Sequence, residues 1–115
     1  MSAAGRLRER VAFDEPVQAP TGDGGTVTGW SEPPVSHECR AEFIYARGSE
    51  AIDAARLTGR SIYKVRIRSS QAARRITSAW RMRDVHRDVE YQVREVDAIT
   101  DRHWIYVVVE SGVAV

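Results

Sequence analysis

Three basic side chains stand at every second position of one short segment, which makes them the best candidates in this chain for a binding role. The segment is Tyr63-Lys64-Val65-Arg66-Ile67-Arg68. Successive side chains of a β-strand point to opposite faces, so Lys64, Arg66 and Arg68 are expected to share one face while the apolar residues share the other. A row of three positive charges can stay solvated, pair with an acidic partner, or contact a polyanion.

Two further charged sets could complete such a contact. The basic set, near the start of the chain, consists of Arg6, Arg8 and Arg10 at alternate positions. The acidic set, which precedes the segment 63–68, consists of Glu38, Glu42 and Glu50. One interpretation is cross-strand ion pairing on a solvated face, with each pair contributing at most about 1 kcal/mol. The other is a charge-complementary subunit interface, or a wall that faces DNA phosphates. The interface would use both basic rows together with Glu38 and Glu42.

No group of residues indicates catalysis, a metal site or a cofactor. The three histidines are not spaced as metal ligands on a helix. Cys39 could meet a histidine in the folded chain, but a small buried cysteine explains it better. The acids Asp84, Asp88 and Glu90 lack the spacing of a calcium-binding loop, so a solvated turn is expected there. We therefore expect a protein that is not an enzyme and that needs no cofactor and no metal.

Length and charge restrict the functional classes further. The chain has 115 residues, enough for a single domain over residues 1–115 with one modest core. Its formal net charge is only +1, and its pI is about 8.0, which disfavours a dedicated DNA-binding domain. Sixteen of its 17 basic residues are arginine, a side chain suited to planar contacts at protein interfaces, although a GC-rich genome would give the same bias.

Cysteine content and hydropathy predict the compartment. A single cysteine cannot form an internal disulfide, which fits a reducing cytosol. No apolar run approaches the length of a membrane span, and the first residues lack the apolar core of a signal peptide. We therefore expect no membrane partner and assembly in the cytoplasm.

Alternating apolar and polar residues predict a mainly β fold. The expected strands cover residues 7–13, 26–30, 35–45, 62–68, 80–83, 89–93 (with a possible extension to 99) and 103–109. Residues 48–57 predict the one short helix, which Ser49 can cap and Gly59 ends. Six to seven short antiparallel strands with one short helix indicate a small β-barrel or sandwich.

Two segments stand apart from the strands. Residues 14–25 combine prolines and glycines with few apolar residues, which predicts a long flexible hairpin loop. Residues 45–60 contain the short helix, whose apolar stripe is too thin for a core element. This second segment is expected either to pack on the sheet or to project from it.

Several short motifs follow one another in an order that is informative as a whole. They are Gly5-Arg6-Leu7-Arg8-Glu9-Arg10-Val11, Gly24-Gly25-Thr26-Val27-Thr28-Gly29-Trp30, Arg40-Ala41-Glu42-Phe43 with Gly48-Ser49-Glu50, the basic segment at 63–68, and Ile76-Thr77, Trp80-Arg81-Met82 and Tyr91-Gln92-Val93. In this order they resemble the head-closure family of tailed phages and gene transfer agents, also called head–tail joining, stopper or adaptor proteins. The resemblance covers nearly the whole chain.

This resemblance implies a structural virion protein without catalytic activity. Such a protein forms a ring, six-fold or twelve-fold, between the portal side of the head and the tail. The ring closes the DNA channel after packaging and offers a docking surface to the tail. Its implied neighbours are further copies of itself, a portal-side adaptor protein, a tail-terminator or tail protein, and the DNA in the channel, in a phage-like particle assembled in the bacterial cytoplasm.

The resemblance also implies a role for residues 45–60. The corresponding family segment can project into the channel, where Arg47, Arg56 and Arg60 would face the DNA. A surface helix that only packs on the barrel is the alternative for this segment.

A small β-barrel that binds nucleic acid is the alternative function. Such barrels present aromatic residues for base stacking on a basic face. In the segment 62–68 the only aromatic residue is Tyr63, which is expected to point away from the basic side chains. We therefore expect the basic face to lack aromatic residues, which disfavours this alternative.

Overall fold

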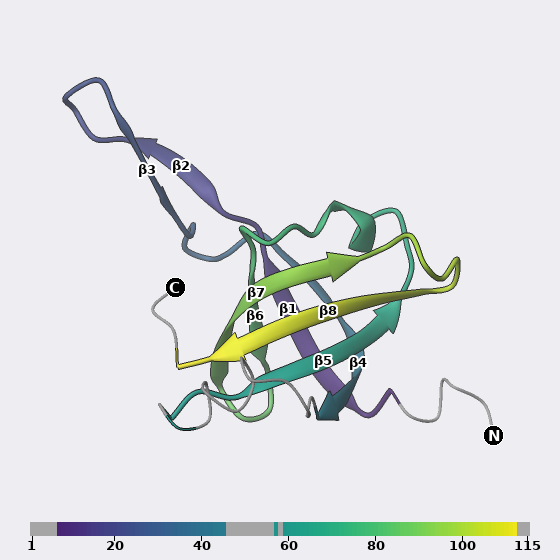
Figure 1. Ribbon diagram of the computed structural model, residues 1–115. Coiled ribbons are helices and arrows are strands. Elements are labelled where there is room, and N and C mark those ends of the chain that lie inside the picture. Colours follow the sequence, from purple (N-terminus) through teal and green to yellow (C-terminus); the bar gives the residue numbers. More distant parts are fainter. Residues whose placement is uncertain (1–6, 46–56, 58, 113–115) are drawn as a thin grey trace.

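Most of the chain forms short antiparallel strands. The computed structural model describes residues 7–45, 57 and 59–112, and Figure 1 shows their arrangement. In this part of the chain the strands are β1 (Glu9–Asp14), β2 (Val17–Pro20), β3 (Thr26–Gly29), β4 (Ser36–Tyr45), β5 (Ile62–Arg68), β6 (Arg81–Asp84), β7 (Val89–Asp97) and β8 (Trp104–Ser111). A 3-10 turn, η2 (Ala73–Arg75), lies between β5 and β6. The predicted mainly β class is confirmed.

Six of these strands close into a barrel. Their order is β1-β4-β5-β8-β7-β6, and β6 pairs back onto β1. All six pairings are antiparallel, and the closure decides between the two predicted architectures in favour of the barrel. Each barrel strand is hydrogen-bonded on both sides, so the barrel has no open edge.

The interior of the barrel holds the apolar core. On β5, Val65 and Ile67 are fully buried, whereas Lys64 and Arg68 on the opposite face are exposed, as the alternation predicts. The larger buried side chains come from several strands and include Phe13, Ile67, Met82 and Ile105. Ala73 and Ile76, from the segment around η2, join the same cluster and tie the β5–β6 connection to the core.

Strands β2 and β3 form a separate two-stranded hairpin that projects away from the barrel (Figure 1). The turn between them uses Gly22 and Gly24 with φ of 88° and 93°, a conformation that glycine adopts without steric cost. The predicted flexible loop at 14–25 thus includes strand β2. Its first residue, Asp14, ends β1 and is fully buried. The mobility of the segment stays a prediction.

The predicted helix at 48–57 and most of the projecting segment 45–60 lie outside the described residues. The described chain ends β4 at Tyr45 and resumes continuously at Gly59, three residues before β5. Whether this segment projects or packs on the barrel stays a prediction.

Candidate functional site

The outer surface of β5 and β8 brings three basic side chains beside two aromatic rings. In the register of these strands, Arg66 is opposite Tyr106 and Arg68 is opposite Trp104. The guanidinium carbons of Arg66 and Arg68 lie 4.5 and 5.2 Å from the centre of the Trp104 ring. The ammonium nitrogen of Lys64 lies 5.0 Å from the centre of the Tyr106 ring. We call these five residues the basic–aromatic face; each of its cation–π contacts contributes roughly 0.5–1 kcal/mol at an exposed site.

The prediction that the basic face lacks aromatic residues is therefore wrong. Tyr63 does point the other way, but Trp104 and Tyr106 reach the same face from the neighbouring strand. The alternation of residues 104–109 does predict that these two rings lie on one side of a strand. It does not predict that this strand, β8, pairs with β5, because no local sequence pattern encodes that pairing.

Arg66 is already compensated within its own chain. Glu42 lies directly opposite it on β4, and Oε1 of Glu42 is 3.0 Å from an outer guanidinium nitrogen of Arg66. The two side chains are only 19% and 14% exposed, so the pair is less weakened by solvent than a surface pair. Lys64 and Arg68 are the exposed members of the row.

The other predicted interface residues lie on adjoining strands. Arg10 on β1 forms an ion pair with Glu38 on β4 at 3.0 Å, with both side chains about half exposed. Arg8 is exposed just before β1, whereas Arg6 and Glu50 lie outside the described residues. Strands β1, β4 and β5 are neighbours in the barrel, so these residues form one continuous outer surface. Two cross-strand ion pairs, Arg10–Glu38 and Arg66–Glu42, are thus made within the chain, as the ion-pair interpretation expects.

Only one of the three predicted channel arginines falls in the described part of the chain. Arg60, just before β5, lies 3.5 Å from Oε1 of Glu110, and Arg94 lies 3.7 Å from the same oxygen. Glu110 itself is buried. Two arginines therefore share one carboxylate at this end of β5. Arg47 and Arg56 lie outside the described residues.

A buried carboxylate anchors the projecting hairpin to the barrel. Oδ2 of Asp14 accepts hydrogen bonds from Nε of Arg81 at 2.8 Å and from Nε of Arg83 at 2.7 Å. Oδ1 accepts from an outer nitrogen of Arg83 at 3.0 Å and from the hydroxyl of Ser36. The guanidinium of Arg81 also lies 4.5 Å from the centre of the Trp30 ring, which follows β3 directly. We call these five residues the hairpin anchor, because they join both ends of the hairpin to β6.

The electrostatics of Asp14 follow from these contacts. Burial alone would raise the pKa of its carboxyl group, but the hydrogen bonds from Arg83, Ser36 and Arg81 outweigh burial and lower the pKa below its usual value. Asp14 is therefore ionised in the folded protein. Asp14 falls in the predicted flexible loop at 14–25, since its arginine partners lie 67 and 69 residues further along the chain and leave no local signal of burial.

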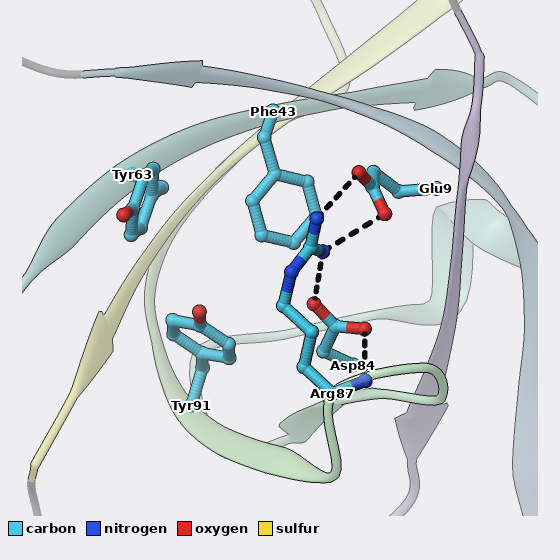
Figure 2. Close-up of a pocket in the computed structure, with 6 residues that line it drawn as sticks. All are labelled: Glu9, Phe43, Tyr63, Asp84, Arg87 and Tyr91. Atoms are coloured by element: carbon cyan, nitrogen blue, oxygen red, sulfur yellow. Dashed lines mark hydrogen bonds and ion pairs between the residues drawn. The ribbon is translucent and has the colours of Figure 1, made fainter.

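One open end of the barrel carries a pocket of about 220 Å³, shown in Figure 2. Three aromatic rings line it, from Phe43, Tyr63 and Tyr91, with centroid separations of 5.6 to 6.2 Å. Arg87 extends across the pocket, and its two outer nitrogens donate to Glu9 at 2.9 and 3.0 Å. One of them also donates to Asp84 at 2.8 Å.

The charged side chains of this pocket pair with one another. Asp84 also accepts hydrogen bonds from the backbone N–H groups of His86 and Arg87, so it ties together the β6–β7 turn. Burial would raise its pKa, but these hydrogen bonds and the charge of Arg87 lower it. Asp84 is thus a buried structural acid rather than part of a solvated turn. The three charged side chains that line the pocket, Glu9, Asp84 and Arg87, are thus already engaged with one another.

Among the described residues, no three histidine, cysteine, aspartate or glutamate side chains are grouped to hold a metal ion. In the same part of the chain, no helix has the length and apolar character needed to cross a membrane.

A comparison with known protein families identifies the family of this chain. A family model described as "Phage head completion protein" matches residues 3–112. The chain belongs to this family. The resemblance found in the sequence motifs is therefore confirmed. The family is one of structural virion proteins, and its description supports a role at the junction of head and tail.

Solved structures share the fold over nearly the whole chain. One is a chain from the virion of a native gene transfer agent particle, with a TM-score of 0.63 and 19% identity over 94% of this chain and 96% of that one. Another is the solution structure of protein SF1141 from Shigella flexneri 2a, with a TM-score of 0.66 and 16% identity over 96% and 97% of the two chains. At these identities the similarity concerns the fold alone. No curated protein sequence matches the chain.

The structure also bears on the alternative that Cys39 is a nucleophile. Burial, with a contribution from the charge of Glu38, raises the pKa of the Cys39 thiol to about 12. Because the thiolate is the reactive form, we expect iodoacetamide at pH 8 to alkylate the folded chain at least about a hundredfold more slowly than the urea-unfolded chain. Intact-mass measurements over time would give both rates. Equal rates would show that Cys39 is an accessible, activated thiol.

Proposed function

We propose that this head completion protein forms a ring in the head–tail connector, between the portal side of the head and the tail. The ring closes the DNA channel after packaging and provides the surface on which the tail docks. The family match over residues 3–112 carries this proposal. The implied neighbours are a portal-side adaptor protein and a tail-terminator or tail protein, in a phage or gene transfer agent particle assembled in the bacterial cytoplasm. The protein acts without catalysis and without a cofactor.

The barrel surface supports one half of a ring interface. A cyclic ring of identical subunits needs two different patches that fit each other, one on each side of every subunit. The predicted interface residues on β1, β4 and β5 form one continuous surface with exposed basic groups at Lys64 and Arg68. Because Glu38 and Glu42 are paired within the chain, we infer that this surface meets a different patch of the next subunit.

Reversing one exposed charge on this surface tests the interface. We expect Arg68→Glu to leave the fold intact and to reduce incorporation into particles at least tenfold, because a like-charge contact at an interface costs several kcal/mol. Arg74→Glu, an equal change of charge at an exposed position in η2, is the matched control. Quantitative mass spectrometry of purified particles measures incorporation. Normal incorporation of Arg68→Glu would remove this surface from the ring interface.

The channel-closing role is assigned to residues 45–60 and to Arg47, Arg56 and Arg60. The described part of this region places two arginines, Arg60 and Arg94, beside Glu110. Basic side chains suit a loop that faces packaged DNA, because DNA phosphates attract cations at short range. The second candidate function, nucleic-acid binding by the barrel wall, is favoured by the basic–aromatic face.

One DNA-binding experiment separates these two surfaces. We expect the triple change of Arg47, Arg56 and Arg60 to serine to lower the slope of log affinity against log salt by up to roughly 0.9 per lost phosphate contact. We expect the change of Lys64 and Arg68 to serine to leave that slope unaltered. Fluorescence anisotropy with labelled duplex DNA at several salt concentrations measures the slope. The reverse pattern would favour the nucleic-acid-binding barrel over the channel role of residues 45–60.

A further inference from the structure

Strands β2 and β3 of the projecting hairpin pair only with each other, so each has one edge that is unpaired over its whole length. The six barrel strands are closed on themselves, whereas β2 and β3 pair only with each other. An unpaired strand edge offers a row of backbone N–H and C=O groups to another chain. The two edges of this hairpin differ in what they offer.

The register of the hairpin defines which backbone groups point outward. The N–H of Thr21 donates to the carbonyl of Gly25 at 3.0 Å, and these two residues continue the register in which Val17 is opposite Gly29. Hydrogen-bonded and non-hydrogen-bonded pairs alternate along an antiparallel ladder. The pairs Gln18–Thr28 and Pro20–Thr26 are therefore the non-hydrogen-bonded ones, and the backbone groups of these four residues point away from the hairpin.

This alternation leaves one edge blocked and the other intact. On β2, Pro20 has no N–H to offer, and Pro16 occupies the next position of the same parity before the strand. Gln18 is thus the single outward donor between the two prolines. On β3, both Thr26 and Thr28 keep outward N–H and C=O groups, on β-branched residues that favour extended backbone. The β3 edge can accept a further strand, and the β2 edge cannot.

We propose that the β3 edge binds an extended segment of a different polypeptide by strand addition. This step rests on the proposed ring. Two copies joined β3 to β3 would be related by a two-fold axis, which closes a pair and cannot build a cyclic ring. A head-to-tail contact between β3 of one copy and β2 of the next is excluded by the prolines. Neither hairpin strand of a second copy can thus supply the added strand in a ring, and we assign that strand to a non-identical virion protein.

The hairpin also defines the chemistry of the added segment. Val27 is 54% exposed and lies on one face of β3, whereas Thr26 and Thr28 lie on the other face. A bound strand places alternate side chains beside these two faces. We expect a segment with an apolar residue beside Val27 and polar residues beside the two threonines.

The hairpin anchor favours this binding. Asp14 and Trp30, at the two ends of the hairpin, are both held by Arg81, which is itself only 11% exposed. The direction of the hairpin relative to the barrel is thereby held in the free protein. A binding element that is already oriented loses less conformational freedom when its partner docks.

Hydrogen exchange tests the proposal without any mutation. In the isolated chain, we expect the amides of Thr26 and Thr28 to exchange rapidly. In assembled particles, we expect both amides to exchange at least tenfold more slowly. The amide of Gln18, on the blocked edge, should exchange at a similar rate in both. Slow exchange of Thr28 in the isolated chain, or unchanged exchange in particles that contain the protein, would overturn strand addition.

A pair of proline variants then separates the two edges. Gln18 and Thr28 lie directly opposite each other, and neither N–H takes part in the hairpin ladder. We expect Thr28→Pro to lower the yield of complete particles at least tenfold and Gln18→Pro to leave it near the natural level. Equal effects of the two changes would overturn the assignment of the β3 edge. Absence of the natural protein from complete particles would instead overturn the proposed function itself.

Discussion

Replacing Asp14 with alanine should lower the free energy of unfolding by about 3 kcal/mol, because it leaves two partly buried guanidinium groups without their buried carboxylate. Arg81 and Arg83 both direct Nε at the same oxygen of Asp14, at 2.8 and 2.7 Å. Glu90→Ala is the matched control, since Glu90 is an exposed carboxylate 3.8 Å from Arg81 and should contribute less than about 0.5 kcal/mol. Urea unfolding followed by tryptophan fluorescence measures both. Similar losses of unfolding free energy in the two variants would mean that the buried Asp14 stabilises the fold no more than the exposed Glu90 does.

The same carboxylate makes a prediction about pH. Burial opposes ionisation of Asp14, but its donors lower the pKa below the ordinary value of 3.8. A group with a lowered pKa stabilises the folded state fully above the pKa of the unfolded chain, and this contribution is lost as the pH falls through the folded-state pKa. The difference in stability between the natural protein and Asp14→Asn should therefore be constant above about pH 5 and shrink below pH 4. A difference that grows on acidification would contradict the ionised state of Asp14.

Replacing Phe13 with alanine should cost about 4 kcal/mol, since it removes a large, fully buried side chain from the barrel interior. Domains of this size are stable by only about 5–15 kcal/mol, so the variant would be close to unfolding at physiological temperature. Val27→Ala, an apolar truncation on the exposed hairpin, should change stability by less than about 0.5 kcal/mol.

Calorimetry and urea unfolding of the two variants distinguish the barrel from the hairpin. With a urea m-value of roughly 1–3 kcal/mol/M, the Phe13→Ala midpoint should fall by about 2 M. A shift of a few tenths of a molar unit would show that neighbouring side chains refill the space, and that the barrel interior is less tightly packed than the burial of Phe13 indicates.

Local alternation was enough to predict the six barrel strands, strand β3 and the faces of β5, whereas β2 lies in a segment predicted to be a flexible loop. Val65 and Ile67 point into the barrel because a half-buried strand repeats every two residues, and this period can be seen in six residues of sequence. The Ser36–Tyr45 strand followed from the same rule, and the motifs led to the correct family.

The site was less predictable, because its contacts join residues far apart in the chain. The rings of Trp104 and Tyr106 reach the basic residues only through the pairing of β8 with β5. The segment Asp14-Glu15-Pro16 has the composition of a turn. The burial of Asp14 depends on arginines from β6, which lie far away in the sequence. Register and long-range charge pairing arise from closure of the barrel, and no local pattern of side chains contains them.

The anchored hairpin on a closed barrel has a mechanical consequence. A lateral force on the hairpin tip would act as a torque about its base, where Asp14 and Trp30 are gripped by Arg81. Beyond that base the load would spread into the strands of a closed barrel, which has no outermost strand to detach first. The hairpin would then act as a lever: if a partner bound to its tip moved, the barrel would rotate with it as a rigid body.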